Sequence, residues 1–237
     1  MGTFRPRLEI LPVEQRSLWP ELAPTVELGF ALYGGTAIAL RLAHRPSVDF
    51  DFFSEAPLDR DAIRSALPFV GTARVLQDVR DAWTMLVPSK GGERSEVKVS
   101  FFGGIDFGRV GEPERTNDGV VVAASLADLL ATKVKVVLQR AEAKDYRDIA
   151  AMLKAGANLA DGLAGAVAMF GGGFQPSECL RALVFFRDGD LGSLADSEQR
   201  LLVNAVTAVR DLAEARIVSR RLGVDLKRER GGPGLNR

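Results

Sequence analysis

The stretch LYGGTAIALRLAHRPSVDFDFFS, residues 32–54, decides how this chain folds. It predicts a strand ending in a Gly-Gly-Thr turn, a short apolar helix, a basic turn and a second strand on which carboxylates alternate with apolar residues. Because residues i and i+2 of a strand point to one face, Asp49 and Asp51 present their carboxylates side by side. Adjacent carboxylates repel each other unless a cation lies between them, so the pair predicts a divalent-metal site.

The turn before the helix is suited to a phosphate. Gly34 and Gly35 have no Cβ and let a ligand approach the backbone, while Thr36 adds a hydroxyl to the free N–H groups of a helix start. Either motif alone is a weak signal, since most glycine pairs are turns and surface strands also carry Asp-x-Asp. Together they are more specific, because a phosphate at the helix start can meet a metal on the neighbouring strand.

Composition limits the classes of protein that need considering. The 237 residues are 46% hydrophobic and contain 31 basic and 31 acidic side chains, which argues against a generally basic nucleic-acid binder. The single cysteine, Cys179, excludes a disulfide framework within the chain. No segment approaches the roughly 20 apolar residues of a membrane helix, and we expect a soluble cytoplasmic protein with no membrane contact.

Apolar periodicity predicts the elements that follow the carboxylate strand. We expect an N-terminal arm over 1–12, one or two short helices over 13–28, a strand at 30–33, a helix over 59–67 and strands at 72–78, 82–87 and 96–102. On the last strand, Glu96, Lys98 and Ser100 share one face. If this strand neighbours the Asp-x-Asp strand, that polar face looks into the same site.

Two later helices supply charged groups. A helix opened by Ser125 carries Lys133 inside its apolar stripe, where a cation needs an anionic partner unless its side chain extends past the helix to solvent. The next helix begins near Lys144 and places Asp145 and Asp148 about one turn apart. Lys144 and Asp148 are also spaced as an ordinary surface pair, which would stabilise by about 0.3–0.5 kcal/mol.

The basic turn adds three further candidates. Arg45 has a planar donor fork that suits phosphate, and Ser47 points the same way as Asp49, so we expect both to contact nucleotide. His44, the only histidine, is more typical of a structural hydrogen bond than of a catalyst. Composition becomes glycine-rich after residue 155. We therefore expect a domain over 1–155, a helical subdomain over 156–226 with helices at 159–170, 176–187 and 195–222, and a disordered tail over 227–237.

As a set, these motifs resemble the AbiEii/AbiGii-type nucleotidyltransferase toxins of the polymerase-β-like superfamily. The resemblance covers roughly residues 28–155, with the motifs in the expected order, and it is only general beyond them. It rests on GGTA from Gly34, HRPSVDFDFF from His44, SLAD from Ser125, on Lys133 and Arg140, and on KDYRDI from Lys144.

The resemblance implies an α+β fold, in which a mixed nucleotidyltransferase-type sheet is flanked by helices and followed by a helical subdomain. It implies transfer of a nucleotide from an NTP to an acceptor such as tRNA or another RNA, by the toxin of a toxin–antitoxin or phage-defence pair with a cognate antitoxin. By resemblance, Asp49 and Asp51 hold Mg²⁺ or Mn²⁺. The resemblance also implies that Gly34, Gly35 and Thr36 cradle the phosphates and that Lys144 contacts the nucleotide. Lys133 would neutralise charge in the transition state, and Asp145 and Asp148 would order Lys133, Arg140 or the acceptor.

One departure from the superfamily pattern concerns the catalytic base. Such enzymes often carry a third carboxylate on the strand beside the Asp-x-Asp pair, where this chain offers Ser100. Glu96 or Asp106 takes that role, the acceptor is activated otherwise, or the enzyme is weak. The alternative function is therefore an inactive scaffold that binds nucleotide or a partner. A metal-dependent sugar transferase is a third option, but it leaves Gly-Gly-Thr and the Lys133 helix without a role.

Overall fold

The Asp-x-Asp strand lies inside a single mixed β-sheet. The computed structural model describes residues 2–89 and 96–224, and within them eight strands pair in the order β1-β7-β8-β2-β3-β6-β5-β4. The strands are β1 (Thr3–Phe4), β2 (Ala31–Tyr33), β3 (Asp49–Phe53), β4 (Arg74–Val79), β5 (Ala82–Pro88), β6 (Glu96–Phe102), β7 (Glu114–Thr116) and β8 (Val122–Ala123). β3 pairs antiparallel with β2 and parallel with β6, so the carboxylate strand has a neighbour on each side.

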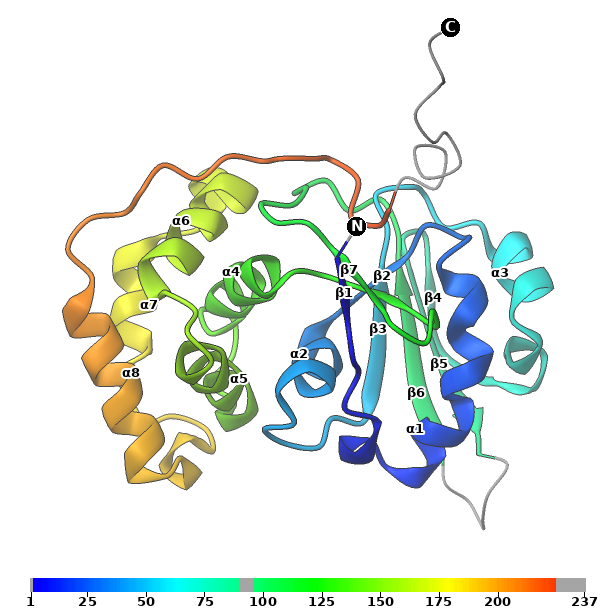
Figure 1. Cartoon of the computed structure of the whole chain (residues 1–237), viewed down its shortest axis with the longest axis horizontal. Coiled ribbons are helices and arrows are strands. Elements are labelled where there is room, and N and C mark those ends of the chain that lie inside the picture. The colour runs from blue at the N-terminus through cyan, green and yellow to red at the C-terminus, as the bar shows by residue number, and fades with distance from the viewer. Residues whose placement is uncertain (1, 90–95, 225–237) are drawn as a thin grey trace, which may run out of the picture.

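Helices cover both faces of this sheet. In Figure 1, α1 and α3 lie on one face, and α2, α4 and α5 lie on the other, with α6, α7 and α8 beyond them. The α-helices are α1 (Val13–Leu18), α2 (Gly34–Leu42), α3 (Arg60–Ala66), α4 (Leu126–Val136), α5 (Ala143–Lys154), α6 (Leu159–Phe170), α7 (Pro176–Ala182) and α8 (Asp196–Ala208). Short 3₁₀ turns occur at η1 (Leu8–Ile10), η2 (Trp19–Thr25), η3 (Pro68–Thr72), η4 (Gly171–Gly173) and η5 (Leu191–Ser193).

Strand alternation places the core and the site on opposite faces of β3. Phe50 and Phe52 are completely buried in the core, while the two carboxylates on the other face are partly exposed. Residue i+2 periodicity explains both facts at once. The α+β fold predicted from the sequence is confirmed, and the described part of the chain contains no helix long and apolar enough to cross a membrane.

The N-terminal arm is part of the sheet rather than separate from it. Thr3 and Phe4 form β1, which pairs in parallel with β7. Neither this strand nor β7 and β8 was predicted. Strands of two or three residues are too short to show an alternating pattern, so only tertiary pairing reveals them.

The C-terminal part departs from the predicted helices. The expected helix over 195–222 ends at Ala208, and the one over 176–187 ends at Ala182. Residues 209–224 cross from α8 back to the sheet (Figure 1). There the Val218 N–H donates to the Arg109 carbonyl at 2.8 Å, and Leu222 is completely buried. These contacts, made far from the local sequence, override its helical periodicity.

The helices after residue 155 pack on the two helices before it. α6 lies against α4, and α8 lies against α5. The domain division near residue 155 stays a prediction, and the expected tail over 227–237 lies outside the described residues.

Candidate nucleotide-transfer site

A cleft of about 800 Å³ opens over the polar face of β3 and β6. The start of α2, the turn that follows α2, and α4 also line it, together with single residues of β4, β5, α5 and α6. Six basic and two acidic side chains line it. They are Arg45, Lys98, Lys133, Lys135, Arg140 and Lys144, facing Asp49 and Asp51. Positive charge is thus in excess among the lining side chains, although Asp145, Asp148 and Glu142 behind them pair with four of these cations and leave a small surplus.

Strand register places the carboxylates beside the polar face of β6. Asp49 pairs with Lys98 and Asp51 with Ser100, and the Lys98 ammonium lies 3.2 Å from the Asp49 carboxylate. The predicted contribution of this face is thus confirmed for Lys98 and Ser100. It is wrong for Glu96, which lies outside the cleft and accepts a hydrogen bond from Arg74 at 2.9 Å.

The carboxylates of Asp49 and Asp51 suit a magnesium site whose remaining ligands would come from a bound substrate. Burial and the neighbouring Asp49 raise the pKa of Asp51, and Lys98, a hydrogen bond from Ser100 and the charge of Lys133 only partly oppose this. A dication between the two carboxylates would remove that repulsion. The described residues hold no cluster of three or more metal-binding side chains. Mg²⁺ is commonly held by one or two carboxylates together with substrate phosphates, so two suffice.

The two glycines let the start of α2 approach the carboxylates closely. Gly34 has φ of +75°, and a Cβ there would lie 3.0 Å from an Asp51 carboxylate oxygen. A Cβ on Gly35 would lie 2.5 Å from the Arg45 guanidinium and 3.0 Å from the Ser47 hydroxyl. The positive φ thus favours glycine at Gly34, a side chain at Gly35 would have to displace the Arg45 guanidinium, and both residues line the cleft.

Thr36 has a supporting position instead of the predicted contact with ligand. Its side chain is buried and does not line the cleft. The hydroxyl donates to the Asp49 carbonyl and lies 2.9 Å from the Ser47 hydroxyl. Thr36 thus ties α2 to the carboxylate strand, whereas Ser47 reaches the cleft wall as expected.

Lys133 is held by two buried carboxylates. Its ammonium lies 2.6 Å from an oxygen of Asp145 and 2.6 Å from an oxygen of Asp148, both completely buried. Asp145 also accepts a hydrogen bond from Arg140 at 2.8 Å. The ammonium is itself almost fully buried, so the alternative in which Lys133 extends past the helix to solvent is wrong.

Asp148, on α5, contacts the basic turn that follows α2. It accepts hydrogen bonds from His44 at 2.7 Å and from the Arg45 guanidinium at 2.7 and 2.9 Å. Burial raises the pKa of Asp148, but the His44 hydrogen bond and the charges of Lys133 and Arg45 outweigh it and hold the pKa below its usual range. The surface-pair alternative is therefore wrong, and Lys144 instead pairs with Glu142 at 2.7 Å.

These contacts change the interpretation of the basic turn. The fork of Arg45, which predicted phosphate binding, is occupied by Asp148, and its remaining Nη1 donates to the Pro46 carbonyl. His44 has the structural role favoured by the sequence. Asp106, one of the two candidate bases, is exposed and does not line the cleft.

Several cleft residues were missed at the sequence level. They are Tyr33, Phe53, Gln77, Thr84, Phe102, Phe107, Lys135, Gln139 and Phe170. Two of these residues follow from the strand register. Gln77 on β4 pairs with Thr84 on β5, and Thr84 pairs with Ser100 on β6, so all three lie in one row across the sheet. Phe170 comes from α6, and no local signal links it to this cleft.

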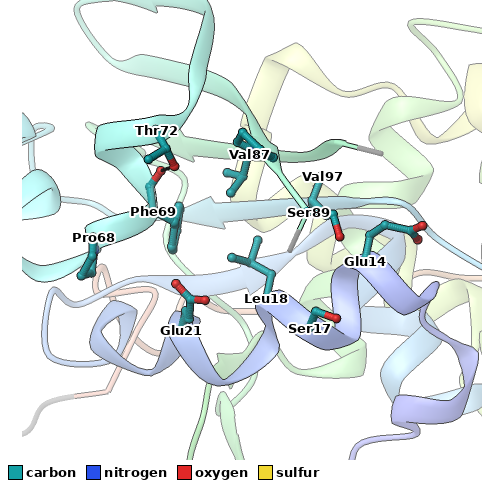
Figure 2. Close-up of a pocket in the computed structure, with 11 residues that line it drawn as sticks. Glu14, Ser17, Leu18, Glu21, Pro68, Phe69, Thr72, Val87, Ser89 and Val97 are labelled. Carbon is teal, nitrogen blue, oxygen red and sulfur yellow. Dashed lines mark hydrogen bonds between the residues drawn. The ribbon is translucent and has the colours of Figure 1, made fainter. Parts of the chain in front are cut away.

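A second cavity, of about 410 Å³, lies on the opposite face of the sheet. It lies between α1, η3 and the ends of β5 and β6 (Figure 2), where Leu18, Phe69 and Val87 contribute apolar surface. Glu14 and Glu21 also line it, whereas no basic side chain does among the residues described there. Its chemistry is the opposite of what a triphosphate needs, so of these two cavities the cleft over β3 is the candidate site.

The mixed sheet, with paired carboxylates beside a glycine-opened helix, defines a nucleotidyltransferase fold. Two solved structures share it at low sequence identity. A nucleotidyltransferase-like antigenic protein from Paracoccidioides brasiliensis is 18% identical, with a TM-score of 0.52 over 82% of this chain and 93% of that one. MenT4, a nucleotidyltransferase toxin from Mycobacterium tuberculosis, is 17% identical, with a TM-score of 0.50 over 84% and 92%.

Sequence comparison narrows the class to a family. The family model for the nucleotidyl transferase AbiEii toxin of type IV toxin–antitoxin systems matches residues 21–207. The chain belongs to this AbiEii family, as the sequence motifs predicted. An uncharacterized protein from Aquifex aeolicus is 32% identical over 145 residues, which span 59% of this chain and 65% of that protein's length.

Proposed function

We propose that this protein is a Mg²⁺-dependent nucleotidyltransferase that moves a nucleotide from an NTP to a hydroxyl of an RNA acceptor, with tRNA as the leading candidate. It acts in the cytoplasm as the toxin of a toxin–antitoxin pair, with its cognate antitoxin as partner. The observation that carries this proposal is the opposition of Asp49 and Asp51 to Lys133 in one cationic cleft. Family membership supports the toxin assignment.

The metal would be held by Asp49 and Asp51. When bound, Mg²⁺ supplies charge neutralisation for the triphosphate and orients the reacting groups; Mn²⁺ could serve the same role. The start of α2 adds free backbone N–H groups at Gly34 and Gly35, which suit phosphate oxygens. Ser47 contributes a hydroxyl at the same end of the cleft.

Lys133 would neutralise charge on the transferred phosphate. Its ammonium lines the cleft and acts electrostatically on Asp51, while Asp145 and Asp148 fix its position from below. Because the cation is already held in place, little reorganisation is needed when charge develops during the reaction. Arg140 and Lys144 stand at the more exposed rim and can attract the polyanionic substrates.

The reaction is an in-line displacement at the α-phosphorus. A bond forms between the acceptor oxygen and the α-phosphorus, the bond from that phosphorus to the bridging oxygen breaks, and pyrophosphate and a proton are released. Phosphoryl transfer depends mainly on positioning and electrostatic stabilisation. The structure is consistent with this emphasis, because neither Glu96 nor Asp106 lines the cleft to serve as a third carboxylate.

A second candidate function follows from Ser100. This residue faces Asp51 and donates to it at the position where a third carboxylate would stand. A nucleotide-binding scaffold without transfer activity would have the same cationic cleft. It predicts nucleotide-dependent thermal stabilisation with no turnover.

One assay separates the two functions. Purified protein is incubated with each α-labelled NTP, Mg²⁺ and total RNA, and we expect label in RNA only when Mg²⁺ is present. The double variant Asp49→Ala/Asp51→Ala should lose transfer, whereas Asp61→Ala, at a highly exposed carboxylate outside the cleft, should keep it. Transfer that survives the double substitution would reject this site, and nucleotide binding without transfer would favour the scaffold.

A further inference from the structure

Four phenylalanine rings line one end of the cleft. We call Phe53, Phe102, Phe107 and Phe170 the aromatic patch; each is partly exposed. Phe53 follows Asp51 by two residues on the same face of β3, which places it about 7 Å further along the strand. The patch therefore begins one step beyond the carboxylate pair, at the Asp51 end, whereas Ser47 precedes Asp49 at the other end.

Phe53, Phe107 and Phe170 pack against the hydrophobic core at its edge, and the sheet register places the rings of Phe53 and Phe102 on the cleft side. β3 and β6 both end in Phe-Phe, and the register pairs Phe52 with Phe101 and Phe53 with Phe102. The first pair is completely buried in the core, with ring centroids 5.5 Å apart. The second pair lines the cleft that also contains the charged side chains of Asp49, Asp51 and Lys98, and both of its rings are partly exposed.

Phe53 stacks on the buried Tyr33 ring at 4.8 Å and 13°, so one of its faces is covered, whereas the contacts within the patch are steep. Phe53 meets Phe102 at 5.1 Å and 72°, and Phe107 meets Phe170 at 5.2 Å and 62°. Edge-to-face contacts of this kind give aromatic side chains defined orientations. The Lys135 ammonium lies 6.0 Å from the centre of the Phe170 ring, so a cation accompanies the patch.

We propose that the aromatic patch stacks a nucleobase during transfer, an inference that rests on the function proposed above. Aromatic rings beside basic side chains are how proteins hold unpaired nucleotides, because every base presents a π-face. The phosphates bind over the two carboxylates and the start of α2, and the base lies beyond Asp51 along β3. That base belongs either to the incoming NTP or to the terminal residue of the acceptor RNA.

Equilibrium binding tests the patch without requiring turnover. The probes are an NTP, inorganic tripolyphosphate and a short single-stranded RNA, each measured with Mg²⁺ present. The variants are Phe102→Leu and Phe170→Leu, which retain apolar volume but remove the ring, and Phe102→Trp, which restores a ring. Phe185→Leu is the matched control, because Phe185 is half exposed and lies outside the cleft. Thermal midpoints confirm that each variant is folded.

We expect the leucine variants to raise Kd about 10- to 100-fold for either the NTP or the RNA, with Phe102→Trp near the wild-type value. Tripolyphosphate affinity should not change, since that ligand has no base. A change confined to the NTP assigns the donor base, and a change confined to the RNA assigns the acceptor base. Unchanged Kd values for both ligands in folded variants, or equal losses for tripolyphosphate, would overturn the proposal.

Transfer assays with the same proteins separate this proposal from the function on which it rests. Wild-type protein that binds nucleotide through the patch but transfers nothing would refute the transferase function alone. Wild-type protein that transfers normally, with leucine variants unchanged in KM for NTP and for RNA, would refute stacking alone. Failure of the wild-type protein to bind either nucleotide ligand would overturn both.

Discussion

Replacing Asp148 by asparagine tests whether the buried carboxylate holds the site together. Asp148 accepts hydrogen bonds or ion pairs from Lys133, His44 and Arg45, all within 2.9 Å, and it is completely buried. One oxygen faces His44 and Arg45, and the other faces Lys133 and Arg45. Whichever way the new amide turns, its NH₂ group must therefore point at a cationic donor. Arg45 then loses its counter-charge, and Lys133 keeps only Asp145.

The expected loss of stability is large. Removing one partner of a buried ion pair typically costs about 3–5 kcal/mol, and here one substitution affects two cations. Urea unfolding at pH 7 should therefore show the free energy of unfolding of Asp148→Asn reduced by at least about 3 kcal/mol. The matched control is Asp211→Asn at an exposed carboxylate, where a change within about 0.5 kcal/mol is expected.

The pH dependence follows from the lowered pKa of Asp148. A carboxylate whose pKa is lower in the folded state stabilises the fold above its unfolded pKa of about 3.9, and it loses that contribution as the pH falls towards the folded value. The difference between wild type and Asp148→Asn should thus be full at pH 7 and shrink only below about pH 4. A difference under about 1 kcal/mol at pH 7, or one that shrinks between pH 8 and pH 6, would refute this account.

Three further predictions concern the carboxylates and the C-terminal segment. Asp51→Asn should raise the free energy of unfolding of the metal-free protein at pH 7 by about 0.5–2 kcal/mol, because it removes a carboxylate whose pKa is raised. Added Mg²⁺ should raise the thermal midpoint of the wild-type protein but not that of the variant. Ser100→Asp adds a carboxylate opposite Asp51, so it should lower the thermal midpoint without Mg²⁺ and recover it with Mg²⁺. The variant should also transfer nucleotide faster than wild type, and slower transfer would show that no base is needed at this position. Leu222→Ala should cost about 2–5 kcal/mol in urea unfolding, and a loss under 1 kcal/mol would mean that residues 209–224 are not anchored by that side chain.

The sequence predicted the parts of the fold that have local periodicity. Alternation on β3 and β6 identified both strands and their polar faces, and the apolar stripe of α4 placed Lys133 on the buried side, with extension to solvent as the alternative. The buried position of Lys133 required an anion, and the structure supplies two. What periodicity could not give were the short strands at the β1 edge and the extended path of residues 209–224, since those depend on pairing between distant segments.

Site roles were harder to predict than site membership. Arg45 and Thr36 lie beside the cleft as expected, yet their polar groups bind Asp148 and the Asp49 carbonyl. A donor in a sequence motif has several neighbours once the chain folds, and the motif does not say which one it will bind. The aromatic patch illustrates the reverse case. A Phe-Phe pair at a strand end is typical of a core, and only the register shows that one ring of each pair faces the cleft.

The network beneath Lys133 explains how a cation can lie in this cleft without being neutralised by Asp49 and Asp51. Lys133 comes from α4, and the carboxylates that hold it come from α5. Asp148 also binds His44 and Arg45, which follow α2, so the same residue fixes the turn that leads into the carboxylate strand. Both sides of the cleft are thereby positioned by one buried group. Because Asp145 and Asp148 sit below the cleft rather than in it, the ammonium keeps its place while its field still reaches Asp51. A transferred phosphate held between Asp51 and the Lys133 ammonium would meet a cation already in position. Electrostatic stabilisation is most effective in this arrangement.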